Sequence, residues 1–220
     1  MQIKSFCPRL KKQLGFTMIE LLIVIAILGI LAVAVLSAIN PIEQINRGRD
    51  TGSRSDAEQL LTAIDRYYAM QGYFPWQMNP NDPIGIHGGA DDQMVHIDNT
   101  LNQVSDCPIL YLLSDTTAGL TADCADSVGS QELKVTFVDK VSATNYNELY
   151  IYHSDDDYAS TYVCFAPQSN SFRVEALARF DYDADGTIEA AEVPDDYPTN
   201  AYAQAPDGIC GSEGNCVCLP

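Results

Sequence analysis

A segment near the C-terminus has the residue types and the spacing of a calcium-binding loop. The sequence DYDADGTIEAAE, at positions 181–192, matches the pattern D-x-[DN]-x-[DN]-G-x5-E at every specified position. Asp at alternate positions can turn carboxylates toward one hard cation, and Gly186 permits the sharp turn that follows. The oxygen donors would be Asp181, Asp183, Asp185, the backbone carbonyl of Thr187, Glu189 through a water molecule, and Glu192 with both oxygens. The pattern therefore predicts bound calcium (Ca2+).

The segments on either side of this loop differ from those of an EF-hand. An EF-hand has a helix on each side, whereas residues 172–180 alternate between apolar and polar like a strand. Beyond the loop, Pro194 would stop a helix within a turn of Ala190. We therefore expect a structural calcium site at the end of a strand, without the helix pair that opens in calcium sensors. The alternative is a solvated acidic turn without a bound ion.

A second candidate for chemistry is Glu20, the only charged residue in the apolar run from Phe16 to Ile39. As a helix this run would be roughly 36 Å long, enough to cross a bilayer. A carboxylate inside an apolar span is costly in lipid, so Glu20 needs a partner. If the chain were cut after Gly15, the new ammonium group on Phe16 would lie one helical turn from Glu20.

The stretch KKQLGFTMIELLIVIAILGILAVAVL, residues 11–36, resembles the type III signal of type IV pilins and type II secretion pseudopilins. The matching residues are Gly15, Phe16, Thr17, Ile19, Glu20, Leu21 and Leu22, followed by the apolar IVIAILGILA. The resemblance implies that a membrane-embedded prepilin peptidase cleaves after Gly15 and methylates the amine of Phe16. It also implies that Glu20 pairs with the terminal ammonium of a neighbouring subunit while a filament grows. The implied partners are other copies, other pilins and an inner-membrane assembly platform.

Two other kinds of N-terminal segment compete with this interpretation. A secretory signal peptide would have an apolar core of about 7–15 residues without an acid in it. A plain membrane anchor would have the length, but it would explain neither the Gly15–Phe16 junction nor Glu20.

Charge indicates where the two parts of the chain reside. The formal net charge is -18, yet residues 1–15 hold four of the twelve basic residues and no acid. A basic flank before a span predicts a cytoplasmic N-terminus and an exported C-terminal domain. We expect a single-pass inner-membrane protein before assembly and an extracellular or periplasmic filament afterwards. So acidic a domain is not expected to bind nucleic acid by neutralising phosphates.

Six cysteines follow residue 15, an even number that favours disulfides in an exported domain. They are Cys107, Cys124, Cys164, Cys210, Cys216 and Cys218. Cys107 and Cys124 bracket the apolar run 108–113, and we predict that they are bonded to each other. A zinc site is disfavoured because the last three cysteines have no nearby histidine at ligand spacing.

The elements that would position these residues form an α+β fold. A long helix, interrupted near Asn40-Pro41, is expected from about Phe16 to Met70, ended by Gly72 and Pro75. Its apolar stripe contains Ala57, Leu60, Leu61, Ile64 and Tyr68. Four strands of an antiparallel meander are predicted at 133–137, 148–152, 160–165 and 172–180, and the apolar run 108–113 should dock onto the core. The apolar face of the sheet would cover the helix stripe, which agrees with the pilin resemblance.

These elements divide the chain into five segments. Residues 1–15 form a leader, and residues 16–73 form the N-terminal helix, transmembrane over about 16–39. An irregular region covers 74–130 and the antiparallel sheet covers 131–180. The C-terminal region, 181–220, holds the calcium loop and three of the cysteines.

No pattern of catalytic residues is present in the sequence, so we do not expect an enzyme. His87, His96 and His153 lack ligand spacing and are expected to be packed or solvated. The predicted function is a structural subunit of a type IV pilus or a secretion pseudopilus. The alternatives are a monomeric membrane-anchored calcium-binding module and a minor tip pilin that binds a surface or ligand through residues 76–130.

Overall fold

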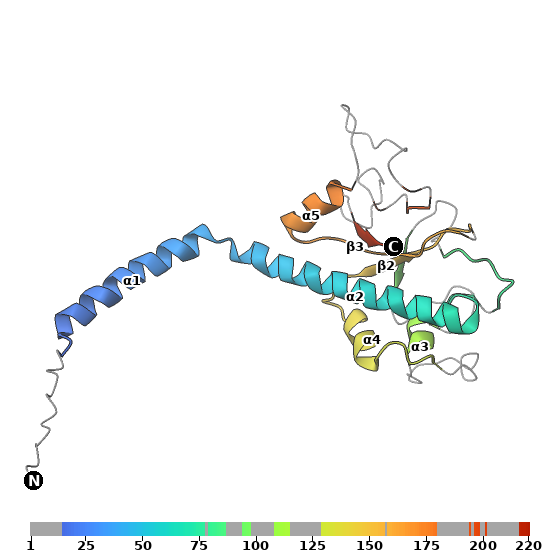
Figure 1. The fold of residues 1–220 in the computed structure, drawn as a ribbon, viewed down its shortest axis with the longest axis horizontal. Helices are drawn as coiled ribbons and strands as arrows, with labels where there is room; N and C mark the ends of the chain where they lie inside the picture. The colour runs from blue at the N-terminus through green and yellow to red at the C-terminus, as the bar shows by residue number, and fades with distance from the viewer. Residues whose placement is uncertain are drawn as a thin grey trace, which may run out of the picture. The chain divides into compact units, whose positions relative to one another are not determined.

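The computed structural model forms two units, and each is described by itself (Figure 1). The units are Met1–Pro41 and Ile42–Pro220. The residues that the structure describes are 15–77, 79–86, 94–97, 108–114, 129–156, 158–179, 194, 196–198, 201 and 216–220. The predicted calcium loop, Cys107, Cys124, Cys210 and His87 lie outside these residues.

Helix α1, Met18–Ala38, begins with a capping box and ends before a proline. The Thr17 hydroxyl accepts from the backbone N–H of Glu20, and the Glu20 carboxylate accepts from the backbone N–H of Thr17. At the other end, Ile39 is extended, and α2 starts at Pro41. The interruption predicted near Asn40-Pro41 is therefore confirmed. Its physical reason is that the residue before a proline avoids the helical region.

Helix α2, Pro41–Gln71, is the central element of the second unit. Ala57, Leu60 and Ile64 are fully buried along it, as the predicted stripe requires. The predicted stripe is wrong at Tyr68, which is 43% exposed, because its neighbour Tyr67 takes the buried position. The helix ends as expected, because Gly72 has a φ of 78°. This left-handed conformation suits glycine and closes the last helical turn.

The described strands form one antiparallel sheet in chain order. They are β1 (Val95–Ile97), β2 (Leu149–Tyr152), β3 (Tyr162–Phe165) and β4 (Val217–Leu219). The predictions at 148–152 and 160–165 are confirmed by β2 and β3. Both strands are buried on both faces, since one face packs on α2 and the other joins a second cluster of aromatic and cysteine side chains.

The other two predicted strands are wrong. Residues 133–137 give an isolated bridge at Leu133 and then helix α4, Val135–Val141. Residues 172–180 lie largely in helix α5, Asn170–Leu177. In α5 the buried side chains, Phe172 and Ala176, are four residues apart, as on one face of a helix. A short apolar run fits a helix or a strand, and here the helical spacing prevails.

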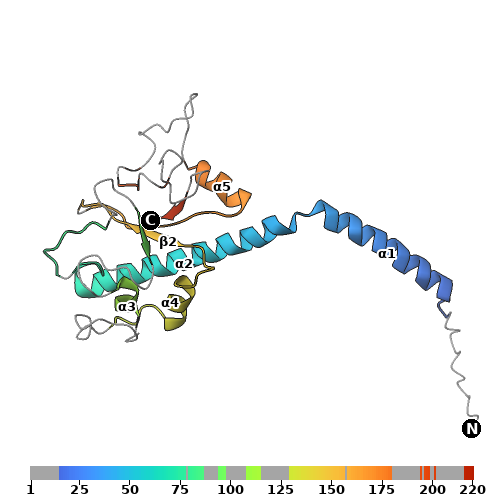
Figure 2. The ribbon, with the colours of Figure 1, turned by 180° about the vertical axis from the view of Figure 1, so that it is seen from behind.

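Helix α2 lies between two layers of the second unit (Figures 1 and 2). The sheet and α5 lie on one side of it, and α3 (Ile109–Leu113) and α4 lie on the other. Ile109, Leu110 and Leu113 are fully buried, so the predicted docking of this apolar run onto the core is confirmed.

The buried carboxylate of Asp50 joins α2 to the turn that precedes α5. It accepts hydrogen bonds from the backbone N–H groups of Gln168, at 2.9 Å, and Ser169, at 2.7 Å. The Ser169 hydroxyl donates a further bond at 2.6 Å. Ser169 also caps α5, so one carboxylate on α2 fixes where α5 begins.

His153 is buried where the β2–β3 hairpin passes the end of α2. Its ring lies 4.6 Å from that of Phe74 and 5.9 Å from that of Trp76, between ring centroids. Its Nδ1 atom lies 3.2 Å from the Ser160 carbonyl oxygen. Burial lowers the pKa of His153 below 6.5, although the Ser160 carbonyl and the carboxylates of Asp196 and Asp155 oppose this shift.

Replacing Asp50 with Ala should destabilise the second unit by about 3 kcal/mol, because buried N–H groups would lose a charged acceptor. Trp76 is the single tryptophan of the chain and is buried, so its fluorescence during urea unfolding of the detergent-solubilised chain reports this unit. The matched control is Glu58→Ala, which removes an exposed carboxylate of the same helix and should change stability by less than about 0.5 kcal/mol. Equal effects of the two variants would contradict the role assigned to Asp50.

The lowered pKa of His153 predicts that the stability of the second unit depends on pH. The unfolded chain binds a proton to this histidine more readily than the folded chain does. Its contribution to stability is therefore complete above about pH 6.5 and falls as pH drops, by at most about 1.4 kcal/mol per pH unit. Urea unfolding at about pH 7.5, 6.5 and 5.5 should show this slope, and His153→Asn should flatten it. An unchanged slope in the variant would assign the pH dependence to other groups.

Candidate functional site

The surface of α1 is the first candidate for function. Every described side chain from Phe16 to Ser37 is exposed, including Ile19 at 66% and Ile30 at 72%. Residues Met18–Ser37 are long and apolar enough to cross a membrane. Water does not favour such a surface, so lipid or other apolar helices must cover it.

The predicted processing site lies immediately before this helix. Gly15 and Phe16 are outside regular secondary structure, and Phe16 is 78% exposed. A Cβ atom added to Gly15 would meet no atom of the described residues within 4 Å. The peptide bond between the two residues is therefore accessible, which proteolysis requires.

Glu20 lies in the first turn of α1 and bonds to Thr17. Its Oε2 atom accepts from the Thr17 backbone N–H at 3.0 Å and from the Thr17 hydroxyl at 2.7 Å. Thr17 thus satisfies the carboxylate within the chain. A Thr followed three residues later by Glu is the spacing of a capping box, so the sequence carries a signal for this role of Thr17. A carboxylate held here can also pair with an ammonium group that approaches the same end of the helix.

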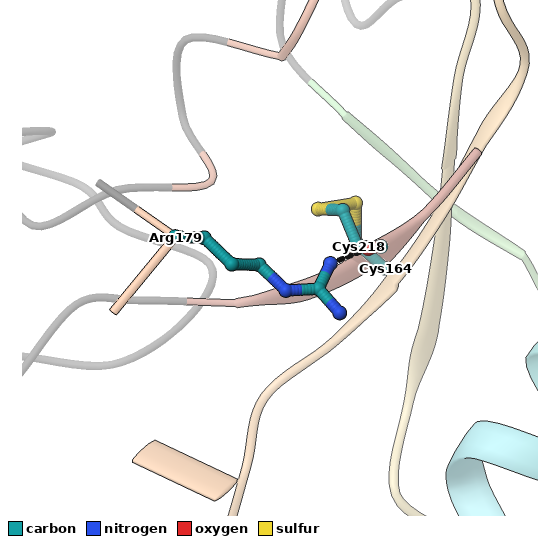
Figure 3. Close-up of a disulfide and its surroundings, with 3 residues drawn as sticks. All are labelled: Cys164, Arg179 and Cys218. Atoms are coloured by element: carbon teal, nitrogen blue, oxygen red, sulfur yellow. Dashed lines mark hydrogen bonds between the residues drawn. A yellow bond between two sulfur atoms is a disulfide. The ribbon is translucent and has the colours of Figure 1, made fainter. Parts of the chain in front are cut away.

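The described cysteines lie at the C-terminal edge of the sheet. Cys164 of β3 and Cys218 of β4 are directly opposite each other and form a disulfide (Figure 3). Cys216 is disulfide-bonded as well. Arg179 reaches over from the end of α5 and donates to the backbone carbonyl of Cys218 (Figure 3). The prediction of disulfides is thus confirmed for these residues, and the pairing of Cys107 with Cys124 stays a prediction.

The described residues on both sides of the predicted calcium loop are held by the sheet. On one side, Arg179 bonds to Cys218 of β4. On the other side, Asp196 accepts from the backbone N–H of Ser160 at 2.6 Å and from the Tyr162 hydroxyl at 3.0 Å. Burial alone would raise the pKa of Asp196, but these hydrogen bonds hold it below its ordinary value of 3.8. Arg179 and Asp196, the described residues that precede and follow the predicted loop, therefore both bond to residues at β3 or β4.

The predicted ligand residues of the calcium loop, from Asp181 to Glu192, lie outside the described residues. Elsewhere in the described part of the chain, no group of three or more His, Cys, Asp or Glu side chains could hold a metal ion. His153 is packed in the core, as expected, and the His96 ring lies 5.5 Å from that of Tyr150.

Comparison with known proteins connects the N-terminal segment to a family. Residues 10–36 match the family described as the prokaryotic N-terminal methylation motif. Over 80 residues the chain is 39% identical to the type IV major pilin protein PilE1 of Neisseria gonorrhoeae. That alignment covers 36% of this chain and 35% of the relative, so the chain matches about a third of the relative's length.

No solved structure matches the chain significantly. The architecture nevertheless agrees with the matched motif, because an exposed apolar helix leads into a second helix that packs on an antiparallel sheet. The N-terminal motif and the similarity to a major pilin support a relationship of this chain to the type IV pilins, and the α+β architecture is consistent with it.

Proposed function

We propose that this chain is a non-enzymatic structural subunit of a type IV pilus or a secretion pseudopilus, assembled through α1. The observation that carries the proposal is an apolar helix exposed on all sides with a single carboxylate in its first turn. Lipid covers such a helix before assembly. In a filament, the same surface is covered by the helices of other subunits.

Processing would prepare this helix for assembly. Prepilin peptidase would cleave between Gly15 and Phe16 and methylate the new amine, with the N-terminus on the cytoplasmic side of the inner membrane. An inner-membrane platform would then bring the subunits together. This order is supported by the accessibility of the junction and by its place just before the span.

Glu20 would select the position of each incoming subunit. In the uncut chain its carboxylate bonds to Thr17, which lowers the cost of holding it near lipid. After cleavage, the ammonium of Phe16 on a neighbouring subunit offers an ionic partner. In an apolar surrounding such a charged pair is considerably stronger than a neutral hydrogen bond, so pairing favours the assembled state.

Substitution of Glu20 should separate processing from assembly. In a host that supplies the peptidase and the platform, Glu20→Leu should insert and be cleaved normally, because it makes the span more apolar. Sheared filaments, measured by electron microscopy and immunoblot, should fall by about tenfold or more, as for a lost buried charge pair. The filament yield of Glu20→Gln should fall by a similar factor, because glutamine keeps the shape of the side chain but removes its charge.

The control is Ser37→Leu, which also replaces a polar side chain of α1 with leucine but lies at the other end of the helix. It should assemble like the wild type. Mass spectrometry of the membrane fraction should find mature chains that begin at an N-methylated Phe16 in all of these variants. A mature wild-type chain that retains Met1, or full assembly of Glu20→Leu, would refute the proposal.

We further propose that residues 181–192 bind calcium and thereby stabilise the C-terminal region. The support is the complete set of oxygen ligands in the sequence and the anchoring of Arg179 and Asp196 on either side. The acids of residues 181–192 are close to one another in the sequence and would repel one another without a cation. A cation would relieve that repulsion.

Calcium should therefore raise the stability of the chain. Ligand that binds only the folded state adds about 2.7 kcal/mol when its concentration is a hundredfold above Kd. Urea unfolding of the detergent-solubilised chain, followed by Trp76 fluorescence, should show a larger gain in calcium than in magnesium or chelator. Asp181→Ala combined with Glu192→Ala should abolish the difference.

A matched control removes two acids elsewhere, at the exposed positions Asp155 and Asp156. This double Ala variant should keep the calcium response. Identical unfolding of the wild type in millimolar calcium and in chelator, without calcium binding in calorimetry, would leave the segment as an acidic turn.

A further inference from the structure

The core-facing stripe of α2 continues beyond the core of the second unit. Ile42 precedes Leu60 by 18 residues, and Ile45 precedes Ala63 by the same number, which is about five turns at 3.6 residues per turn. Each isoleucine therefore lies on the same side of the helix as its later counterpart. Leu60 and Ala63 are 0% and 2% exposed, whereas Ile42 and Ile45 are 67% and 58% exposed. We call Ile42 and Ile45 the open stripe.

Contacts with the rest of the second unit lie on another side of these helical turns. The Glu43 carboxylate accepts from the backbone N–H groups of Asn170, at 3.2 Å, and Ser171, at 3.3 Å. The Asn46 side-chain amide donates to the carbonyl of Gln168 at 3.4 Å. These bonds hold the start of α5 against α2 and leave the open stripe exposed. An apolar surface that continues a buried stripe favours a partner that removes it from water.

The position of the open stripe in the sequence makes the membrane available as that partner. Residues Met18–Ser37 are able to cross a bilayer, and Ile42 follows the last of them by five residues. The charge of Glu20 favours a place at the boundary of the hydrocarbon layer, because a carboxylate is costly deeper in it. A hydrocarbon layer of about 30 Å takes about 20 helical residues, so a layer that begins after Glu20 ends near Asn40.

Counted from that point, the open stripe falls within the headgroup layer. At a helical rise of about 1.5 Å per residue, Ile42 and Ile45 lie at most roughly 3 and 8 Å beyond Asn40, and less if the helix is inclined. The headgroup layer on each side of a bilayer is roughly 5–8 Å thick. Apolar faces of interfacial helices lie at this depth, where the headgroups meet the acyl chains. The length of the chain therefore allows both isoleucines to contact phospholipid.

We propose that the open stripe is immersed in the membrane interface before assembly. The inference rests on the proposed function of a membrane-borne subunit and extends its lipid contact past the break at Pro41. The occupant is phospholipid rather than a second copy, because the stripe continues an apolar span that lipid covers before assembly. The contact also brings the start of α5 close to the membrane, since Glu43 lies between the two isoleucines.

The test places a tryptophan on the open stripe of the full-length, uncut chain, reconstituted in phospholipid vesicles. Trp76 is the single natural tryptophan and is buried, so the wild type gives the background. Phospholipid brominated in its acyl chains should quench Ile42→Trp and Ile45→Trp about twofold or more above this background, because the added rings lie at the acyl boundary. The emission of both added tryptophans should be shifted to the blue of a tryptophan in water.

Two control positions separate the side of the helix from its distance to the span. Gln44→Trp lies between the two isoleucines in sequence but on another side of α2, and it is exposed. Glu58→Trp is exposed on the same helix, more than ten residues farther along. Gln44→Trp should be quenched less than either open-stripe variant, and Glu58→Trp no more than the wild type. Equal quenching of Gln44→Trp and the open stripe would overturn the one-sided contact, as would an open stripe quenched no more than Glu58→Trp.

A tryptophan inside the span separates a failure of this contact from a failure of the proposed function. Ile30→Trp lies within the candidate span and should be quenched most strongly. If it is quenched and the open stripe is not, this inference is refuted and the proposed function is kept. A blue-shifted but unquenched open stripe would assign its cover to a second copy. If Ile30→Trp is not quenched either, the chain is not membrane-borne and the proposed function is refuted. Quenching at the open stripe of a chain that never forms filaments would uphold the contact and refute the filament function alone.

Discussion

The hydrogen bonds to the Asp50 carboxylate connect most of the features that distinguish the second unit. They fix the turn at Gln168 and Ser169 against α2, and this turn sets the start of α5. The end of α5 in turn presents Arg179 to the carbonyl of Cys218 on the last strand. A buried carboxylate is tolerable only when its oxygens are satisfied, so the chain must bring these N–H groups to it or lose stability. The start of α5, and through it the place of Arg179 at the helix's far end, follow from that requirement.

The C-terminal strand shows how the chain closes its sheet. Strand β4 is an edge of the described sheet, and an unpaired edge invites association with other strands. The disulfide between Cys164 and Cys218 holds this strand to β3, and Arg179 occupies its outward carbonyl. In the proposed filament the local concentration of subunits would be high, so protecting this edge would favour the intended contacts over strand exchange.

The two units are adapted to different surroundings. Helix α1 exposes apolar side chains on every side and carries one carboxylate, which Thr17 satisfies within the chain. The second unit buries its apolar residues and carries nearly all of the acids. The first suits lipid and the packed helices of a filament, and the second suits water. The proposed passage from a membrane into a polymer would need both, because only the surroundings would change while the fold is kept.

The sequence alone determined those features that depend on long or strongly patterned segments. Composition and helical periodicity predict the span with its lone Glu20, the buried stripe of α2 and the end of α2 at Gly72. Short runs of strand-forming residues predict strands β2 and β3. The sequence also predicts Thr17 as the N-cap of α1, because Thr is followed three residues later by Glu, the spacing of a capping box.

Tertiary structure decided the short elements. Residues 172–180 alternate well enough for a strand, but Glu43 and Asp50 of α2, more than a hundred positions earlier, supply acceptors for the N–H groups at a helix start. Residues 217–219 become a strand because β3 and the Cys164–Cys218 bond hold them in register. For segments this short, local preference differs little between helix and strand, so contacts distant in the sequence decide between them.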